Sequence, residues 1–348
     1  MRLYTEEGWL DIPHIAGICD RNNINFVVII GKRQVGKTFG VLSYLLDYDK
    51  KFIFLRTTKT EYEVITGGAN SPFEKLPTYA GRITFKREGE YSSLINMACV
   101  SPDGEEYIEE VGKAAALSTF GRIRGINGDP YTDILYDEFI PESHLLTFKK
   151  VGEAFLSMHD TVNGNRELEG RPCIRCWLLA NSNNINNPII DALGISKTIE
   201  RMSLRDIEYV MDKDRGFLIL MPDSSKIAAK RAGGGLYKMI GTDNKYAKMS
   251  LGNEFSQNDF TDVKSLPIQE YNPFVSIGKI TLHLHKNNKT VYVTDRVKAK
   301  AKYEFTDSQS DINKFNRNFG DFRPCFMSGR MIFQEHRLKS YFIDLIGL

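Results

Sequence analysis

Residues 26–46 read FVVIIGKRQVGKTFGVLSYLL, and this stretch decides the fold. The apolar, β-rich run Phe26–Ile30 predicts a buried strand of a parallel sheet. Gly31–Thr38 matches G-x-x-x-x-G-K-[ST] at every fixed position, and Phe39–Leu46 continues with helical apolar spacing. An ordinary turn between a strand and a helix does not require Lys-Thr at the start of the helix. The stretch therefore predicts a nucleotide-binding loop.

Each fixed position of this loop has a chemical reason. Gly31 and Gly36 let the chain curl so that successive N–H groups point at phosphate oxygens. Lys37 brings a mobile cation to the β and γ phosphates, and the Thr38 hydroxyl can ligate Mg²⁺. The following helix directs its positive end at the same anion. The residues predicted to bind ATP are Gly31, Lys32, Arg33, Gln34, Val35, Gly36, Lys37 and Thr38.

A second nucleotide element lies about 100 residues further on, in YTDILYDEFIPES. Residues 133–136 predict a short strand that ends at Asp137 and Glu138. Asp137 is predicted to hold Mg²⁺ together with Thr38. Glu138 is placed to take a proton from an attacking water, which favours ATP hydrolysis by the glutamate-catalysed branch of P-loop proteins. The alternative is that the two acids only cap the next turn.

A third strand, CIRCWLLANSN, ends at Asn181. In this branch the strand between the loop strand and the acid strand ends in a polar residue near the γ phosphate. Asn181 is therefore predicted to orient the water or to sense the phosphate, although it could be a simple turn residue. Strand 50–59, an inserted hairpin within 82–100 and helix 151–163 complete a run of βα units, which predicts a wound parallel sheet with ATP at its carboxyl edge.

Three arginines are candidates for completing the site of a neighbouring subunit. Arg122 and Arg124 lie in the glycine-rich connection before the acid strand, and Arg166 follows helix 151–163. The order of preference is Arg124, Arg166 and Arg122. Each could instead be a solvated loop arginine.

Composition excludes several classes of protein. A net charge of +2 over 348 residues is too small to indicate a nucleic-acid partner through the overall charge of the chain. No apolar run approaches the roughly 18 residues of a membrane span, and the acidic N-terminus argues against a secretory signal. Five cysteines indicate a reduced, cytosolic protein. Cys173 and Cys176 form a CxxC, but on a strand they point to opposite faces and make a poor metal site. His283 and His285 share a strand face without a third ligand.

We expect three regions: an ATPase domain at 1–196, a linker or lid segment at 197–264 and a smaller α+β domain at 265–348. Residues 226–248 are rich in lysine and arginine, which favours contact with a phosphate backbone or a solvated linker. Alternating cations would line one face of a strand, either to bind nucleic acid or to protect a sheet edge. These cations are Arg296, Lys298, Lys300 and Lys302. A final helix is expected at about 329–346.

Together these segments resemble the DNA-packaging ATPases of phi29-like bacteriophages, relatives of the large terminases. The ordered set that carries the resemblance is NFVVIIGKRQVGKT, FIFLRTTK, LYDEF, MHDTVNGNRE, LLANSNNINNP, MPDS, AKMSLGNEF and VYVTD. In that family an arginine thought to act in trans follows HDTV. This chain has Gly164 in that register and Arg166 two residues later. Arg124 occupies the neighbourhood of a family lysine placed as a second trans cation, and is therefore preferred.

The resemblance implies an ATP- and Mg²⁺-dependent motor that drives double-stranded DNA into a preformed prohead. It implies a ring of five subunits in the host cytoplasm, docked on the portal through a prohead RNA. It also implies an RNase H-like nuclease domain that has lost its activity, consistent with Asp295 standing alone on its strand, although Asp307, Asp311 and Asp321 follow downstream. The rival functions are a full terminase with an active nuclease, a P-loop kinase and a non-hydrolysing ring protein.

Overall fold

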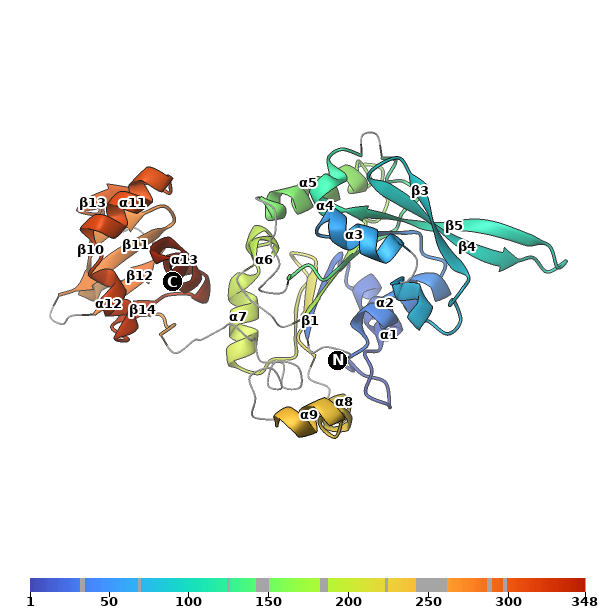
Figure 1. Cartoon of the computed structure of the whole chain (residues 1–348), viewed down its shortest axis with the longest axis horizontal. Coiled ribbons are helices and arrows are strands. Elements are labelled where there is room, and N and C mark those ends of the chain that lie inside the picture. The colour runs from blue at the N-terminus through green and yellow to red at the C-terminus, as the bar shows by residue number, and fades with distance from the viewer. Residues whose placement is uncertain are drawn as a thin grey trace. The chain divides into compact units, whose positions relative to one another are not determined.

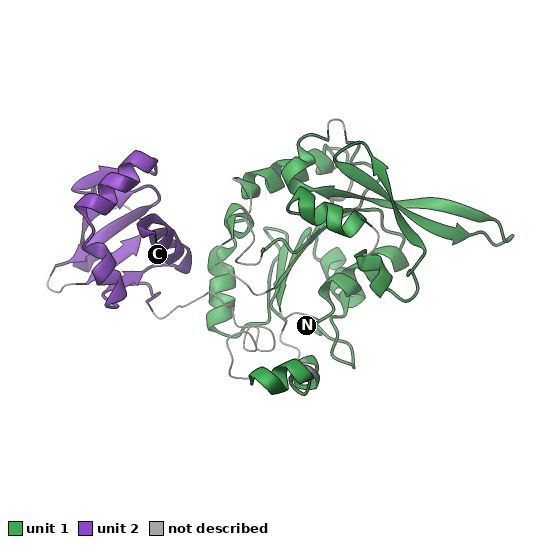
Figure 2. Cartoon of the chain, in the orientation of Figure 1, with its two compact units in different colours: residues 1–256 green, residues 257–348 purple. Residues whose placement is uncertain are grey.

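The structure is a computed structural model of the whole chain (Figure 1). It describes residues 1–31, 35–67, 70–123, 126–141, 150–181, 187–222, 225–241, 262–286, 290–296 and 299–347. The chain divides into two compact units, Met1–Ser256 and Gln257–Leu348 (Figure 2).

The first unit is built on a nine-stranded sheet with the strand order β3-β4-β5-β2-β6-β7-β1-β9-β8. Neighbouring strands from β5 to β9 pair in parallel, and the antiparallel strands lie towards the two edges. The strands are β1 (Phe26–Gly31), β2 (Phe52–Arg56), β3 (Ile83–Glu88), β4 (Ser92–Val100), β5 (Glu106–Ala116), β6 (Asp133–Asp137), β7 (Arg175–Asn181), β8 (Tyr209–Asp212) and β9 (Phe217–Leu220). This arrangement confirms the predicted wound, mostly parallel sheet.

Helices connect these strands. They are α1 (Ile12–Arg21), α2 (Lys37–Asp47), α3 (Lys59–Thr66), the 3-10 helix η1 (Pro72–Lys75), α4 (Leu117–Phe120), α5 (Val151–Asn163), α6 (Pro188–Ala192), α7 (Ser196–Leu204), α8 (Ser225–Ala232) and α9 (Gly235–Ile240). α5 has the bounds predicted from sequence, and the inserted hairpin forms as β3 and β4.

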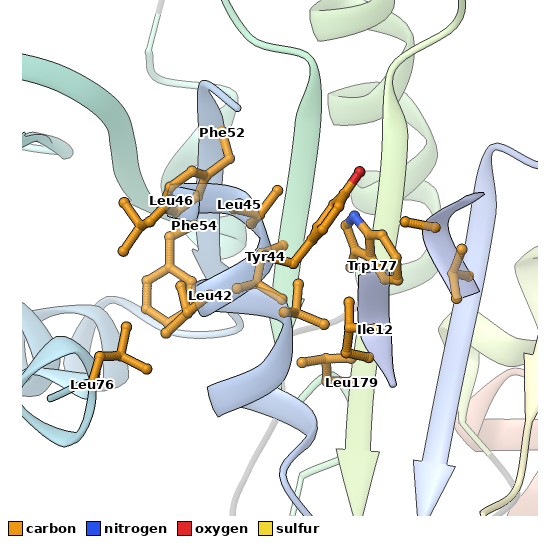
Figure 3. Close-up of a cluster of buried hydrophobic side chains, with 14 of the residues drawn as sticks. Ile12, Leu42, Tyr44, Leu45, Leu46, Phe52, Phe54, Leu76, Trp177 and Leu179 are labelled. Atoms are coloured by element: carbon orange, nitrogen blue, oxygen red, sulfur yellow. The ribbon is translucent and has the colours of Figure 1, made fainter. Parts of the chain in front are cut away.

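One face of the sheet is sealed by α2 (Figure 3). Leu42 and Leu45 of α2 are fully buried in the same cluster as Phe52 and Trp177. The Trp177 indole donates a 2.8 Å hydrogen bond to the Asp133 carboxylate. Burying one such aliphatic side chain stabilises the fold by about 1.5–3 kcal/mol, so the cluster fixes the helix that follows the phosphate-binding loop against the strands.

The segment expected to be a linker contributes to the large sheet. β9 pairs in parallel with β1, and β8 pairs with β9. The first unit extends to Ser256 rather than ending near residue 196. The four buried residues of β9, FLIL, form too short an apolar run to identify a sheet strand without its partner.

The second unit is built on a five-stranded sheet with the order β13-β10-β11-β12-β14. Its elements are the 3-10 helix η2 (Ile268–Glu270), β10 (Tyr271–Ile277), β11 (Ile280–His285), β12 (Val291–Thr294), β13 (Tyr303–Phe305), α11 (Gln309–Asn318), α12 (Phe322–Met327), β14 (Met331–Phe333) and α13 (His336–Ile346). Phe315, Phe333 and Phe342 are fully buried in its core. The dipeptide Asn287-Asn288, whose residue types predict a hairpin turn, lies outside the described residues.

Two expectations for this unit are wrong. The final helix begins at His336, because residues 331–333 form β14, which pairs in parallel with β12. The basic stripe does not lie on a strand: Arg296, Lys300 and Lys302 are all outside β12 and β13, and Lys298 lies outside the described residues. The Lys302 ammonium lies 5.4 Å from the centre of the Tyr303 ring instead of projecting with a row of cations.

No helix in the described part of the chain combines the length and apolar character needed to cross a lipid bilayer. All five cysteines are free thiols. Within the described residues, no three His, Cys, Asp or Glu side chains gather as a metal site, so the CxxC at Cys173 and Cys176 gains no further ligand.

Packing at Gly128 yields a test of the fold. A Cβ atom at this position would lie 2.1 Å from the Val162 carbonyl oxygen at the end of α5. We expect Gly128→Ala to lower the free energy of unfolding by about 1–3 kcal/mol, as overpacking does, measured by urea unfolding followed by circular dichroism. Gly121→Ala is the matched control, because a Cβ there meets nothing within 4 Å. Equal urea midpoints for the two variants would show that this contact is not tight.

Candidate active site

The phosphate-binding loop leads from β1 into α2. Gly36 is the N-cap of α2 and adopts a left-handed φ of 85°. A Cβ at this glycine would also lie 3.2 Å from the Trp9 ring, so both the backbone conformation and the space require glycine. Val35 is buried, whereas Lys32, Arg33 and Gln34 lie outside the described residues. The described part of the loop therefore has the backbone that a phosphate cradle needs.

Lys37 and Asn181 meet at the carboxyl edge of the sheet. Gly31 and Asn181 are paired in the parallel register of β1 and β7. The Lys37 ammonium donates to the Gly31 carbonyl oxygen at 3.0 Å and to the Asn181 side-chain oxygen at 3.2 Å. The sequence prediction that the strand ending in Asn181 lies between the loop strand and the acid strand is confirmed by the order β6-β7-β1.

Thr38 and Asp137 come together although 99 residues separate them. The Thr38 hydroxyl donates a 2.8 Å hydrogen bond to a carboxylate oxygen of Asp137. Burial raises the pKa of the Asp137 carboxyl, while the Arg56 guanidinium and the Lys37 ammonium act in the opposite sense. A hydroxyl and a carboxylate are hard oxygen donors of the kind that Mg²⁺ prefers, so Thr38 and Asp137 would hold this ion, which would neutralise phosphate charge.

Glu138 follows Asp137 with a left-handed φ of 57°. Such a conformation costs a non-glycine residue about 1–3 kcal/mol and persists only when its surroundings impose it. The next residue, Phe139, is buried and donates its N–H to the Leu179 carbonyl oxygen. The turn between these two anchored neighbours leaves the Glu138 side chain 55% exposed, at the edge of the site rather than in the core.

Arg56, which the sequence analysis did not assign to the site, joins the two acids. One guanidinium nitrogen lies 3.0 Å from the Asp137 carboxylate and another forms an ion pair with Glu138. Burial by itself would lower the pKa of this guanidinium, but the two carboxylates outweigh it and raise the pKa. Arg56 ends β2, which pairs with the acid strand β6. The only sequence signal for this role is its position at the end of a predicted strand.

The side chains of Lys37, Thr38, Asp137, Glu138 and Asn181 line one pocket of about 370 Å³. Phe39 and Lys75 also contribute to its wall, and neither was predicted from sequence. The lining residues are Gly36, Lys37, Thr38, Phe39, Lys75, Asp137, Glu138, Ala180 and Asn181. The pocket therefore combines an anion cradle, a buried carboxylate and a second carboxylate at its rim.

The three arginines predicted to act in trans differ in their burial and contacts. Arg166 is 5% exposed, and one of its guanidinium nitrogens donates to the carbonyl oxygens of Gly128, Asp129 and Tyr131. It fastens the connection before β6 to the end of α5, so the described contacts of this side chain are made within its own chain. Arg122 is exposed and its guanidinium lies 5.5 Å from the centre of the Tyr91 ring. Arg124 lies outside the described residues.

Solved structures share the fold of the entire chain. The Phi-28 gp11 DNA packaging motor matches with a TM-score of 0.57 and 15% identity, covering 99% of both chains. The bacteriophage Phi-29 viral genome packaging motor assembly matches with a TM-score of 0.61 and 19% identity, again covering 99% of both chains. At these identities the likeness establishes the architecture and nothing more. A search among curated proteins found no significant match.

The family model of the podovirus DNA encapsidation protein (Gp16) matches residues 104–343, well over half of the chain. The match includes the acid strand β6, the Asn181 strand β7 and most of the second unit. It confirms the resemblance that the ordered motifs indicated, and the chain belongs to the podovirus DNA encapsidation protein (Gp16) family.

Proposed function

We propose that this chain is the ATP-hydrolysing subunit of a ring-shaped motor that drives double-stranded viral DNA into a preformed prohead. The observation that carries the proposal is the single pocket shared by Lys37, Thr38, Asp137, Glu138 and Asn181. Family membership supplies the DNA-packaging context. The pocket supplies the chemistry that such a motor requires.

In the proposed reaction, the loop amides and Lys37 bind the triphosphate. Lys37 exchanges its hydrogen bonds to Gly31 and Asn181 for phosphate oxygens, and Asn181 is left beside the γ phosphate to position the water. Thr38 and Asp137 hold Mg²⁺, which neutralises phosphate charge when it is bound. Glu138 takes the proton of the attacking water.

The contact between Arg56 and Glu138 bears directly on this last role. The Glu138 carboxylate is occupied by its ion pair with Arg56. In the proposed reaction the side chain turns away from Arg56 to reach the attacking water. Its exposed side chain and the open rim of the pocket leave it free to do so.

The proposed assembly is a homo-oligomeric ring, a pentamer, docked on the portal of the prohead in the host cytoplasm with a prohead RNA between them. The two structural neighbours are a packaging motor and a packaging motor assembly, which supports such a ring. Arg124 of one subunit is proposed to reach the triphosphate held by its neighbour. It remains the preferred candidate, because Arg166 is committed to three carbonyl oxygens of its own chain.

The second unit is proposed to be a vestigial nuclease that serves to bind nucleic acid. A two-metal nuclease needs a cluster of free acids. Here Asp295 and Glu335 are both paired with Arg337, and Asp262 lies 3.8 Å from the Lys339 ammonium. The Asp311 carboxylate accepts hydrogen bonds from the N–H and the hydroxyl of Thr306. These acids are paired with cations or already hold hydrogen-bond donors, which disfavours a full terminase.

Glu138→Gln tests the proposed base. The variant should bind ATP normally, because the amide keeps the shape of the side chain, and should hydrolyse it roughly 10²–10⁴-fold more slowly. The measurements are equilibrium binding of a labelled nucleotide and steady-state phosphate release. Glu153→Gln, an exposed position on α5, is the control. Normal turnover by Glu138→Gln would exclude Glu138 as the base.

Arg124 is tested by complementation between subunits. Arg124→Ala should lower hydrolysis by roughly 10³-fold, the usual scale of a trans arginine, without changing thermal stability. A mixture of Arg124→Ala with Glu138→Gln should regain part of the activity. An interface in which the Arg124→Ala subunit holds the triphosphate and the Glu138→Gln subunit supplies the arginine joins an intact catalytic site to an intact arginine. An arginine acting on its own subunit's site would give no recovery.

Arg166→Ala serves as the contrasting variant in that experiment. It should lower the free energy of unfolding by about 2 kcal/mol or more, because three carbonyl oxygens lose a charged donor.

Hydrolysis and cutting assays on the whole chain separate the rival functions. We expect double-stranded DNA and proheads to stimulate phosphate release, and we expect no nicking of supercoiled plasmid in Mn²⁺. Stimulation together with Mn²⁺-dependent nicking would indicate a full terminase. Transfer of phosphate to a small acceptor, without stimulation by DNA, would indicate a kinase.

A further inference from the structure

The β4–β5 hairpin projects from the rest of the first unit (Figure 1). β3 supports β4 only as far as Met97 and Ala98. Beyond that point β4 and β5 form a two-stranded ribbon, closed by a turn in which Gly104 has a φ of 85°. A two-stranded ribbon has no sheet behind it, so both of its faces meet solvent unless another molecule covers one of them.

One face of the ribbon carries exposed aliphatic side chains. Ala98 is paired with Ile108, and Val100 with Glu106, so these four side chains lie on the same face. Val100 is 66% exposed and Ile108 is 73% exposed. Two β-branched side chains exposed at diagonal positions on one face of a ribbon are typical of an interface rather than of a solvent-facing surface.

The same ribbon is strongly acidic. From Glu88 to Gly112 the chain has no lysine or arginine. The acids of the two-stranded part are Asp103, Glu105 and Glu106, and Glu109 and Glu110 follow where β3 supports β4. Among the described residues, none of these acids forms an ion pair with a basic side chain. A phosphate backbone would repel this surface, so its partner is a protein with a basic and partly apolar face.

The first unit itself carries such a face, on α8 and α9. Lys230 and Lys238 are exposed there, the Lys226 ammonium donates to the Glu6 carbonyl oxygen, and residues 225–241 contain no acid. Leu236 and Met239 of α9 are 49% and 78% exposed. A phosphate backbone would pair with the lysines but would leave the exposed aliphatic side chains without apolar contacts. An acidic ribbon that presents valine and isoleucine offers partners to both.

We propose that the β4–β5 ribbon of one copy docks on α8 and α9 of a second copy. The ribbon and α8–α9 lie in well-separated parts of the unit (Figure 1), so they do not meet within one chain. A contact between two different patches of identical chains is head-to-tail, and such contacts close into rings when the rotation allows. The inference does not depend on the chemistry of the phosphate-binding pocket.

The first test compares two adjacent residues of the ribbon. Ile108→Thr removes apolar contact from the face of Val100, and should weaken self-association about tenfold or more in sedimentation velocity. Tyr107→Thr is the matched control, because Tyr107 is exposed on the opposite face of the same strand. Equal losses in the two variants, or a chain that stays monomeric at every concentration, would overturn the proposal. Circular dichroism checks that both variants are folded.

The second test identifies the partner surface. Glu106→Lys and Lys238→Glu should each weaken association, and their mixture should recover it, because opposite charges then face each other again. Lys213→Glu, an exposed position between β8 and β9, is the control and should have no effect. Failure of the mixture to recover would overturn the pairing. A Lys238→Glu variant that loses only DNA binding would assign α8–α9 to nucleic acid instead.

Discussion

The buried carboxylate of Asp137 is the constraint on which the site depends. Only 4% of the residue is exposed, and its charge is held by the Thr38 hydroxyl and the Arg56 guanidinium. A buried carboxylate without such partners would take up a proton rather than remain charged. The three side chains come from α2, β2 and β6, so keeping this charge requires that all three elements be in their places. Tertiary packing and catalytic competence are therefore linked through one group.

The sheet supplies these positions with little freedom. Parallel pairing aligns Gly31 with Asn181 and Asp137 with Leu179, so the ends of β1, β6 and β7 are fixed at one edge. The Trp177 and Asp133 hydrogen bond and the cluster around α2 hold the opposite part of the same strands. The side chains that must move during the reaction lie at the rim of the pocket, where Glu138 is the most exposed acid. Fixed strand ends below exposed side chains suit a site that must bind ATP, hydrolyse it and release the products.

Arginines in this chain serve two distinct purposes. Arg166 and Arg337 hold groups of their own chain, the first by bonding carbonyl oxygens and the second by pairing with Asp295 and Glu335. Arg122 is exposed over an aromatic ring on the surface. Position along the sequence does not separate these uses, since Arg122 and Arg166 both lie just after the end of a helix. Burial and partners separate them.

The sequence by itself determined the phosphate-binding loop, the adjoining acids, the strand that ends in Asn181 and the family, because each depends on short motifs whose residue types are dictated by chemistry. It also indicated the order of β1, β7 and β6. Tertiary structure alone decided that Arg56 contacts both acids, that Arg166 is buried and that β8 and β9 join the large sheet. These are contacts between segments far apart in the chain, and hydrophobic periodicity contains no information about them. The prediction of a basic stripe was wrong for the same reason. Alternating cations lie on one face only if a strand forms, and a strand requires a pairing partner that the local sequence cannot specify.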